Sequence, residues 1–144
     1  MLKFGEIPQG GGGWLKPVEH KDDVAILIEV KAFDHQRPTP NGPKDSALCD
    51  FTFFATQADL DAGKPSSIAQ GMRVEQTILA RDLQGMVGQA VIVTLTQVPP
   101  KKPGQQPAWV YRQPSTSNRD KVVTYATKRE EAKAEAVAAA PDFD

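Results

Sequence analysis

The chain has 144 residues, of which 40% are hydrophobic, and this length fits one domain with appendages that buries a core. The formal net charge of −1 excludes a basic field over the whole molecule that would attract nucleic acid. The single cysteine, Cys49, excludes an intrachain disulfide, and the 12 prolines and 11 glycines indicate many loops.

Membrane insertion and secretion are both disfavoured by the sequence. No stretch approaches the roughly 20 apolar residues that a membrane-spanning helix needs. The N-terminus also lacks the continuous apolar core of a signal peptide. We therefore expect no membrane partner and a cytoplasmic location, in a bacterium or in a phage-infected cell.

Residues 1–23 are predicted to form an arm, because the four consecutive glycines at 10–13 are costly to order. Trp14 follows these glycines directly. We interpret Trp14 either as an anchor in a groove of the body or as a ring that stacks on nucleic acid or a partner.

The next part, residues 24–114, predicts an all-β barrel. Five segments have the alternating or apolar pattern of strands: Asp22–Asp34, Ala47–Thr56, Gly71–Ile78, Ala90–Val98 and Ala108–Gln113. Residues 79–89 predict a short helix between the third and fourth strands. This order, β-β-β-α-β-β, is that of the OB-fold, a five-stranded Greek-key barrel. A small β-sandwich or another five-stranded barrel has the same element count and stays open.

An OB-fold binds its ligands on the face of strands two and three and between two loops. Here the first of these loops is predicted at residues 34–46, with three prolines and the turn signal Asn41-Gly42. The second is predicted at residues 99–107, PPKKPGQQP. Both loops are long and polar, and we expect them to act as flexible jaws.

The fifth predicted strand places Trp109 and Tyr111 on one face and ends in Arg112, directly after a loop that carries Lys101 and Lys102. Residues 95–121 have a net charge of +4, and residues 129–144 have a net charge of −3. Stacking rings beside a cationic loop are what single-stranded nucleic acid binding requires. An ordinary hairpin with a soluble loop has the same pattern.

The candidate nucleic-acid-binding residues are therefore aromatic rings and nearby cations. The candidates for stacking on bases are Trp109, Tyr111, Phe51 and Phe53. The candidates for contacting phosphates or the ligand face are Lys101, Lys102, Arg112, Arg37, Lys44 and Arg73. On the second strand Phe51 and Phe53 face away from Phe54, so one of these two sets must point into the core. We favour Trp109 and Tyr111 as the rings that face the ligand.

The sequence offers no set of residues for catalysis. No His or Cys residues have metal-ligand spacing, and the glycines at 10–13 are not followed by the Lys-Ser/Thr of a phosphate-binding loop. The apolar pattern around Cys49 predicts a buried thiol rather than a nucleophile. We expect no enzyme activity, no cofactor and no metal.

After Pro114 the composition changes, and residues 115–144 predict a helix followed by an acidic tip. Ser117 or Asn118 is the expected cap of an alanine-rich, charged helix. The chain then ends in Asp142, Phe143 and Asp144, which we interpret as a peptide ligand for a partner protein or as a terminus without a role.

Three of these features together resemble the single-stranded DNA-binding proteins of bacteria and their tailed phages. They are the strand order over residues 22–113, the segment VPPKKPGQQPAWVYR and the helix that ends in AAPDFD. The resemblance implies binding of single-stranded DNA without strong sequence preference, in replication or recombination. It also implies contacts of the tip with replication or recombination proteins, and leaves a homo-oligomer open.

Two functions of other classes remain as alternatives. One is a phage structural or assembly protein in which the arm and the helical tail tie subunits together. The other is a module that binds and inhibits a host factor.

Overall fold

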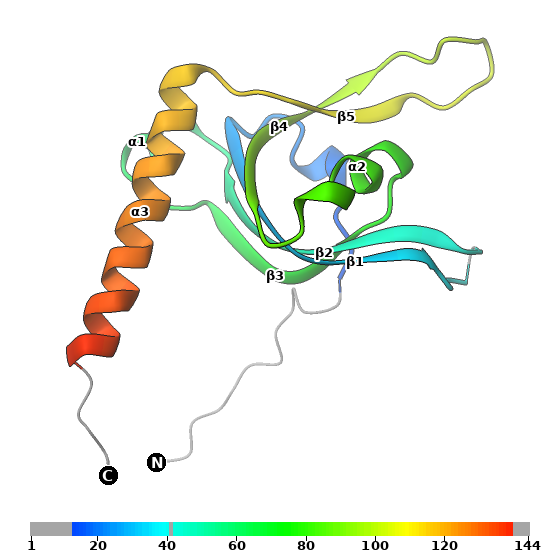
Figure 1. Cartoon of the computed structure of the whole chain (residues 1–144). Coiled ribbons are helices and arrows are strands. Elements are labelled where there is room, and N and C mark those ends of the chain that lie inside the picture. Colours follow the sequence, from blue (N-terminus) through cyan, green and yellow to red (C-terminus); the bar gives the residue numbers. More distant parts are fainter. Residues whose placement is uncertain (1–12, 41, 140–144) are drawn as a thin grey trace, which may run out of the picture.

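The computed structural model describes residues 13–40 and 42–139, which form a curled five-stranded antiparallel sheet with a long C-terminal helix (Figure 1). The strands lie in the order β3-β2-β1-β4-β5. Their bounds are β1 Ala25–Arg37, β2 Lys44–Phe54, β3 Ser67–Val74, β4 Ala90–Val98 and β5 Ala108–Arg112. This half-barrel confirms the prediction of a mainly-β, OB-like fold.

The helices lie between the strands and after them. They are α1 Gln57–Asp61, α2 Thr77–Asp82 and α3 Thr116–Ala139, with 3₁₀ turns at Pro17–Glu19 and Gln84–Met86. The Oγ atom of Ser115 accepts a hydrogen bond from the Asn118 amide at 3.2 Å, so Ser115 caps α3 rather than the predicted Ser117 or Asn118. None of the described helices is both long and apolar enough to cross a bilayer.

The concave face of the sheet holds the main core. Alternate residues of β1 and β2 point inward, among them Ile26, Ile28, Phe51 and Phe53. The rings of Phe51 and Phe53 stack with centroids 5.4 Å apart. Leu79 of α2 and Leu83, directly after this helix, close the core from the open side of the half-barrel. The core fixes which face of each strand is internal.

A second core lies on the convex face, where α3 covers one end of the sheet (Figure 1). Leu27 and Phe54 point outward from β1 and β2 and pack against Val122 of α3 and Leu60 of α1. The ring of Tyr125 meets Phe54 edge-on at 5.4 Å. The proximal half of α3 is therefore part of the folded body.

The connection between β1 and β2 is shorter than predicted. Residues 34–46 were expected as a flexible loop, but the strand ladder continues through the pairs Asp34–Ser46 and Arg37–Lys44, which leaves residues 38–43 as the turn. Gln36 has a positive φ of 51°, and its backbone N–H donates to Asp45 Oδ1 at 3.0 Å. This side-chain acceptor takes the place of a ladder bond at a bulge, so the hairpin stays ordered.

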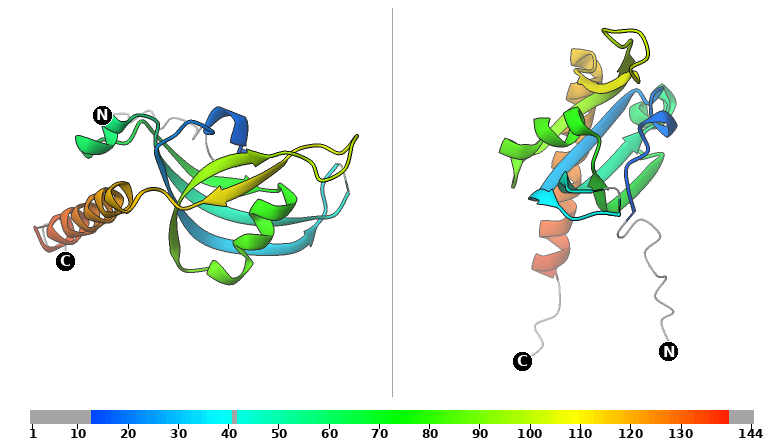
Figure 2. Two further views of the ribbon diagram at one scale, coloured as in Figure 1. Left: turned by 90° about the horizontal axis from the view of Figure 1, so that it is seen from above. Right: turned by 90° about the vertical axis from the view of Figure 1, so that its right-hand side faces the viewer.

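The connection between β4 and β5, residues 99–107, is an exposed loop as predicted, and we call it the finger. Gly104 has a φ of +84°, which a glycine adopts without strain, and it forms part of the turn within the finger. The finger and the β1–β2 hairpin extend from the same side of the half-barrel (Figures 1 and 2). Helices α1 and α3 lie at the other end (Figure 1).

The described part of the predicted arm, residues 13–23, lies on the barrel. The Leu15 amide donates to the Arg73 carbonyl at 2.9 Å, and the Arg73 amide donates to the Gly13 carbonyl at 2.8 Å, which forms a short parallel bridge beside β3. Leu15 enters the main core, whereas Trp14 stays 55% exposed. The anchor of this segment is therefore Leu15 and not Trp14.

Candidate nucleic-acid interface

The finger carries cations that no carboxylate of the described residues neutralises. Lys101 and Lys102 are exposed, and neither has an ion-pair partner in the part of the chain that the structure describes. By contrast, all the cations of β1 and β3 are paired: Lys31 with Asp50, Arg37 with Glu75 and Arg73 with Asp34. The finger thus offers uncompensated positive charge to an anionic ligand.

The β1–β2 hairpin carries a second pair of cations. Arg37 and Lys44 are cross-strand partners next to the turn, so they lie on one face of the hairpin. Arg37 Nη1 lies 3.3 Å from Glu75 Oε2, and Lys44 has no carboxylate partner within residues 13–40 and 42–139. Each of the two hairpins that extend from the barrel therefore has cations near its end.

Two other predicted cations do not join this group. The guanidinium of Arg73 contacts Asp34 and Ser46, is 19% exposed and ties β3 to β1 and β2. Arg112 is exposed, but it lies at the opposite end of β5 from the finger and points to the opposite face from Trp109 and Tyr111. The ion pair with Asp34 therefore disfavours the predicted ligand contact of Arg73, and a phosphate contact of Arg112 stays a prediction, on the other face of β5 from Trp109.

Phe51 and Phe53 are not available for stacking. Both rings are buried in the main core, and the His20 ring stacks on Phe53 at a centroid distance of 3.7 Å. A barrel of this size needs such large apolar side chains to fill its interior. Their assignment as base-stacking residues is therefore wrong, and the inward alternative for this pair of rings is confirmed.

Tyr111 also faces inward, against the expectation that it faces the ligand. Its hydroxyl donates a hydrogen bond to the Leu79 carbonyl at 3.0 Å. Burial, with smaller effects of nearby Cys49 and Asp82, raises the pKa of the Tyr111 phenol far above its ordinary value. Tyr111 therefore joins β5 to α2 and so helps to hold Trp109, two residues earlier on the same strand, in position.

Trp109 packs on the main core and also lines a pocket at the base of the finger. This pocket has a volume of about 300 Å³ and is bordered by Gln76, Thr77 and Ile78 on one side and by Gln106, Pro107 and Ala108 on the other. An aromatic face beside amide and hydroxyl groups can stack on a base and accept or donate hydrogen bonds at its edge. Of the four rings predicted to stack on bases, Trp109 remains a candidate.

A second pocket, with a volume of about 430 Å³, lies beneath the β1–β2 hairpin. It is lined by Trp14, Arg37, Pro38, Thr39, Pro40 and Glu75. The indole Nε1 of Trp14 donates to Glu75 Oε1 at 2.9 Å. Sequence reasoning missed Glu75, because its partners are 61 and 38 residues away and no local pattern connects them.

The two pockets lie on either side of the junction between β3 and α2, since Glu75 lines one and Gln76 lines the other. The Gln76 Nε2 atom donates to the Leu15 carbonyl at 3.0 Å and so holds the N-terminal segment beside this junction. We call these two pockets, together with the cations of the hairpin and of the finger beside them, the strip.

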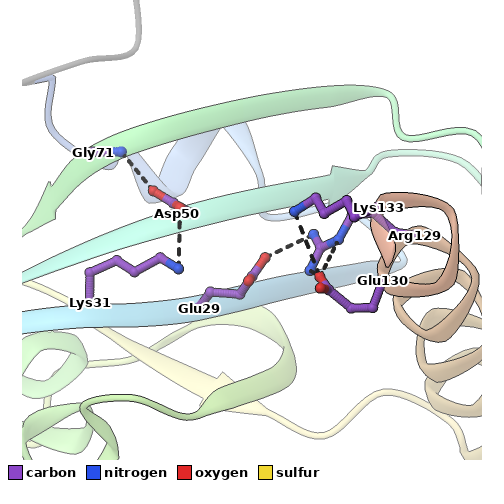
Figure 3. Close-up of polar contacts among 7 residues, drawn as sticks. All are labelled: Glu29, Lys31, Asp50, Gly71, Arg129, Glu130 and Lys133. Atoms are coloured by element: carbon purple, nitrogen blue, oxygen red, sulfur yellow. Dashed lines mark hydrogen bonds and ion pairs between the residues drawn. The ribbon is translucent and has the colours of Figure 1, made fainter. Parts of the chain in front are cut away.

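Ion pairs occupy much of the convex face of β1 and β2 (Figure 3). Lys31 reaches Asp50, whose other oxygen accepts the Gly71 amide, and Arg129 of α3 lies between Glu29 and Glu130. Partial burial opposes the charge of Arg129, but the hydrogen bond to Glu29 and the two carboxylates raise its pKa above the ordinary value. This face is compensated in charge, unlike the finger.

The remaining candidates are Cys49, a metal site and the C-terminal tip. Cys49 is buried as predicted, and this burial raises the pKa of its thiol to about 12, which disfavours the nucleophilic thiolate. No three His, Cys, Asp or Glu residues gather into a metal site within the described ranges. Asp142, Phe143 and Asp144 lie outside the described residues, so their role in partner binding stays a prediction.

Comparisons of the chain with protein-family models, with curated proteins and with solved structures gave no match. The functional assignment therefore depends on the geometry and chemistry of the residues described above.

Proposed function

We propose that this protein binds single-stranded DNA without strong sequence preference, along the strip between its two hairpins. The proposal is supported by cations that have no ion-pair partner among the described residues and by a pocket-lining tryptophan at the base of one of the two hairpins that carry them. Lys101, Lys102 and Lys44 supply charge for the phosphates, and Trp109 supplies a stacking face for a base.

The same arrangement favours a single strand over a duplex. Trp109 is partly buried at the base of the finger, so only an unpaired base can reach its ring. By the resemblance stated above, such binding would protect single strands during replication or recombination, in the cytoplasm of a bacterium or of a phage-infected cell. The function is then binding and not catalysis.

The test is a titration of labelled oligo-dT, oligo-U and a DNA duplex with the full chain, followed by fluorescence anisotropy at several salt concentrations. With about three to five phosphate contacts, we expect a log–log salt slope of about −2 to −4 for oligo-dT, at roughly 0.7 per contact. We expect weaker binding to the duplex.

Absence of binding to either single strand at low salt would overturn the proposal. The structural or assembly role and the host-factor module would then be the remaining functions. A preference for oligo-U over oligo-dT would retain the interface and change the ligand from DNA to RNA.

A further inference from the structure

The exposed indole of Trp14 is held in place by contacts outside its own segment. Its Nε1 donates to Glu75 Oε1 at 2.9 Å, and Arg37 Nη1 lies 3.3 Å from the other oxygen of the same carboxylate. The Glu75 side chain is only 14% exposed and accepts from both partners, although its contact with the Trp14 indole lies at the surface. An exposed tryptophan therefore keeps a fixed orientation, which reduces the entropy that a ligand must remove.

The backbone around Trp14 is fixed as well. Gly13 and Leu15 form hydrogen bonds with Arg73 of β3, and Leu15 is buried in the main core. Because Trp14 is the bridge partner of Arg73, its side chain lies on the same face as that of Arg73 and, two residues on, Glu75. The ring is thus built into the convex side of the barrel next to the β1–β2 hairpin.

The ring forms one wall of a slot. Pro38, Thr39 and Pro40 of the hairpin turn, together with Arg37 and Glu75, complete the pocket of about 430 Å³. This volume exceeds by more than tenfold the roughly 30 Å³ that one water molecule occupies in the liquid. A flat ring facing a turn with two prolines suits a planar, apolar ligand group.

The charges beside the slot indicate what such a group is attached to. Arg37 lines the slot, and its cross-strand partner Lys44 has no carboxylate partner among the described residues. The Glu75 carboxylate lies at the slot itself and repels a phosphate there. A nucleotide matches this arrangement. Its planar base would enter the slot, and its phosphate would stay outside, near the cations.

We propose that this slot is a second base-binding site, in which Trp14 stacks on a nucleobase and Glu75 is its positioning residue. The inference rests on the proposed function and extends it. Single-stranded nucleic acid then occupies two sites on either side of the β3–α2 junction, one at Trp109 and one at Trp14. The segment that precedes the barrel is in this way part of the ligand site.

The chain has two tryptophans, so each can be observed alone. Trp109→Phe leaves Trp14 as the single indole emitter, and Trp14→Phe leaves Trp109. We expect oligo-dT to quench the Trp14 emission of the Trp109→Phe chain, with the same midpoint as the anisotropy of labelled oligo-dT measured in parallel. A duplex of matched sequence should leave this emission unchanged.

The two proposals fail in distinguishable ways. Unchanged Trp14 emission while the anisotropy reports binding would overturn the second site and leave the proposed function intact. Absence of an anisotropy change with the unsubstituted chain would overturn the proposed function and this inference with it.

Glu75 provides a second test. Glu75→Gln keeps an acceptor for the Trp14 indole, whereas Glu75→Ala removes it. We expect Glu75→Ala to weaken oligo-dT binding about tenfold and to reduce Trp14 quenching, and Glu75→Gln to restore most of both. Equal affinity and quenching in Glu75→Ala, in a chain that urea unfolding shows to be folded, would overturn the positioning role.

Discussion

The Tyr111 hydroxyl donates a hydrogen bond to the carbonyl of Leu79 at 3.0 Å, and this contact joins the last strand of the sheet to α2. Replacing Tyr111 by Phe keeps the buried ring and removes the hydrogen bond. We expect the free energy of unfolding to fall by about 1 kcal/mol, measured by urea denaturation. Oligonucleotide affinity should not change, because the ring faces the core. A large loss of affinity at unchanged stability would mean that Tyr111 contacts the ligand.

Trp109 and Phe51 should behave in opposite ways. Trp109→Leu retains part of the packing but removes the stacking face, and we expect oligo-dT affinity to fall by roughly 1–3 kcal/mol. Phe51→Leu leaves a small void in the core, so its effect should be a loss of stability of about 1–3 kcal/mol with affinity retained. Circular dichroism and anisotropy on both variants measure this difference. If Trp109→Leu binds normally, Trp109 is not in the site.

The finger cations are expected to set the salt dependence of binding. A double Lys101→Ala and Lys102→Ala variant removes up to two phosphate contacts, so the log–log salt slope should become shallower by about 1.4, at roughly 0.7 per contact.

The matched control for the finger is the double variant Lys64→Ala and Lys128→Ala. It removes the same charge from exposed residues at the α1–α3 end of the molecule, away from the hairpins (Figure 1). Its slope should equal that of the unsubstituted chain. Equal slopes for the two double variants would mean that the finger does not contact the phosphates.

We expect the order of the β1–β2 hairpin to depend on pH through Asp45. The Gln36 backbone amide donates to Asp45, and this bond, together with the Gln36 side chain and His35, lowers the carboxyl pKa below its ordinary value. A lowered pKa in the folded state means that the stabilisation is present above the unfolded value of about 3.9 and is lost as the pH falls through the folded value. The protection factor of the Gln36 amide, which is the exchange rate of an unstructured amide at the same pH divided by that of Gln36, should therefore fall at acid pH, and Asp45→Asn should abolish this acid dependence.

The ion pair between Glu29 and Arg129 should contribute to the docking of α3. The two atoms Oε1 and Nη1 are 2.9 Å apart, and each side chain is about one-quarter exposed (25% and 22%). We expect a coupling energy of up to about 1 kcal/mol in a double-mutant cycle of Glu29→Gln and Arg129→Gln. Urea unfolding of the four chains measures it, and additive effects would show that Val122 and Tyr125 hold the helix without this pair.

The sequence predicted strand bounds best where an alternating apolar pattern ended at turn residues. The strand Ala90–Val98 was predicted with its observed bounds, because apolar alternation ends at two consecutive prolines. The third strand was predicted at residues 71–78 but lies at Ser67–Val74. Its first four residues, 67–70, are mostly exposed at the sheet edge and have no buried apolar alternation, so pairing with β2 and not their own pattern makes them a strand.

Alternation also cannot tell which face of a strand is internal. Trp109 and Tyr111 share a face as predicted, but only the packing of β5 against α2 shows that this face is the concave one. The Trp14–Glu75 contact spans 61 residues and depends on the N-terminal segment pairing with β3. Local sequence carries no signal for such a contact.

The position of Cys49 has a practical consequence. It is the single thiol of the chain, it lies fully buried at the centre of β2, and its thiolate form is strongly disfavoured. A thiol reagent can therefore react only with molecules in which the barrel has opened. The rate of labelling of the unmodified protein measures how often β2 is released from the sheet, and a bound ligand that bridges both hairpins should slow this rate.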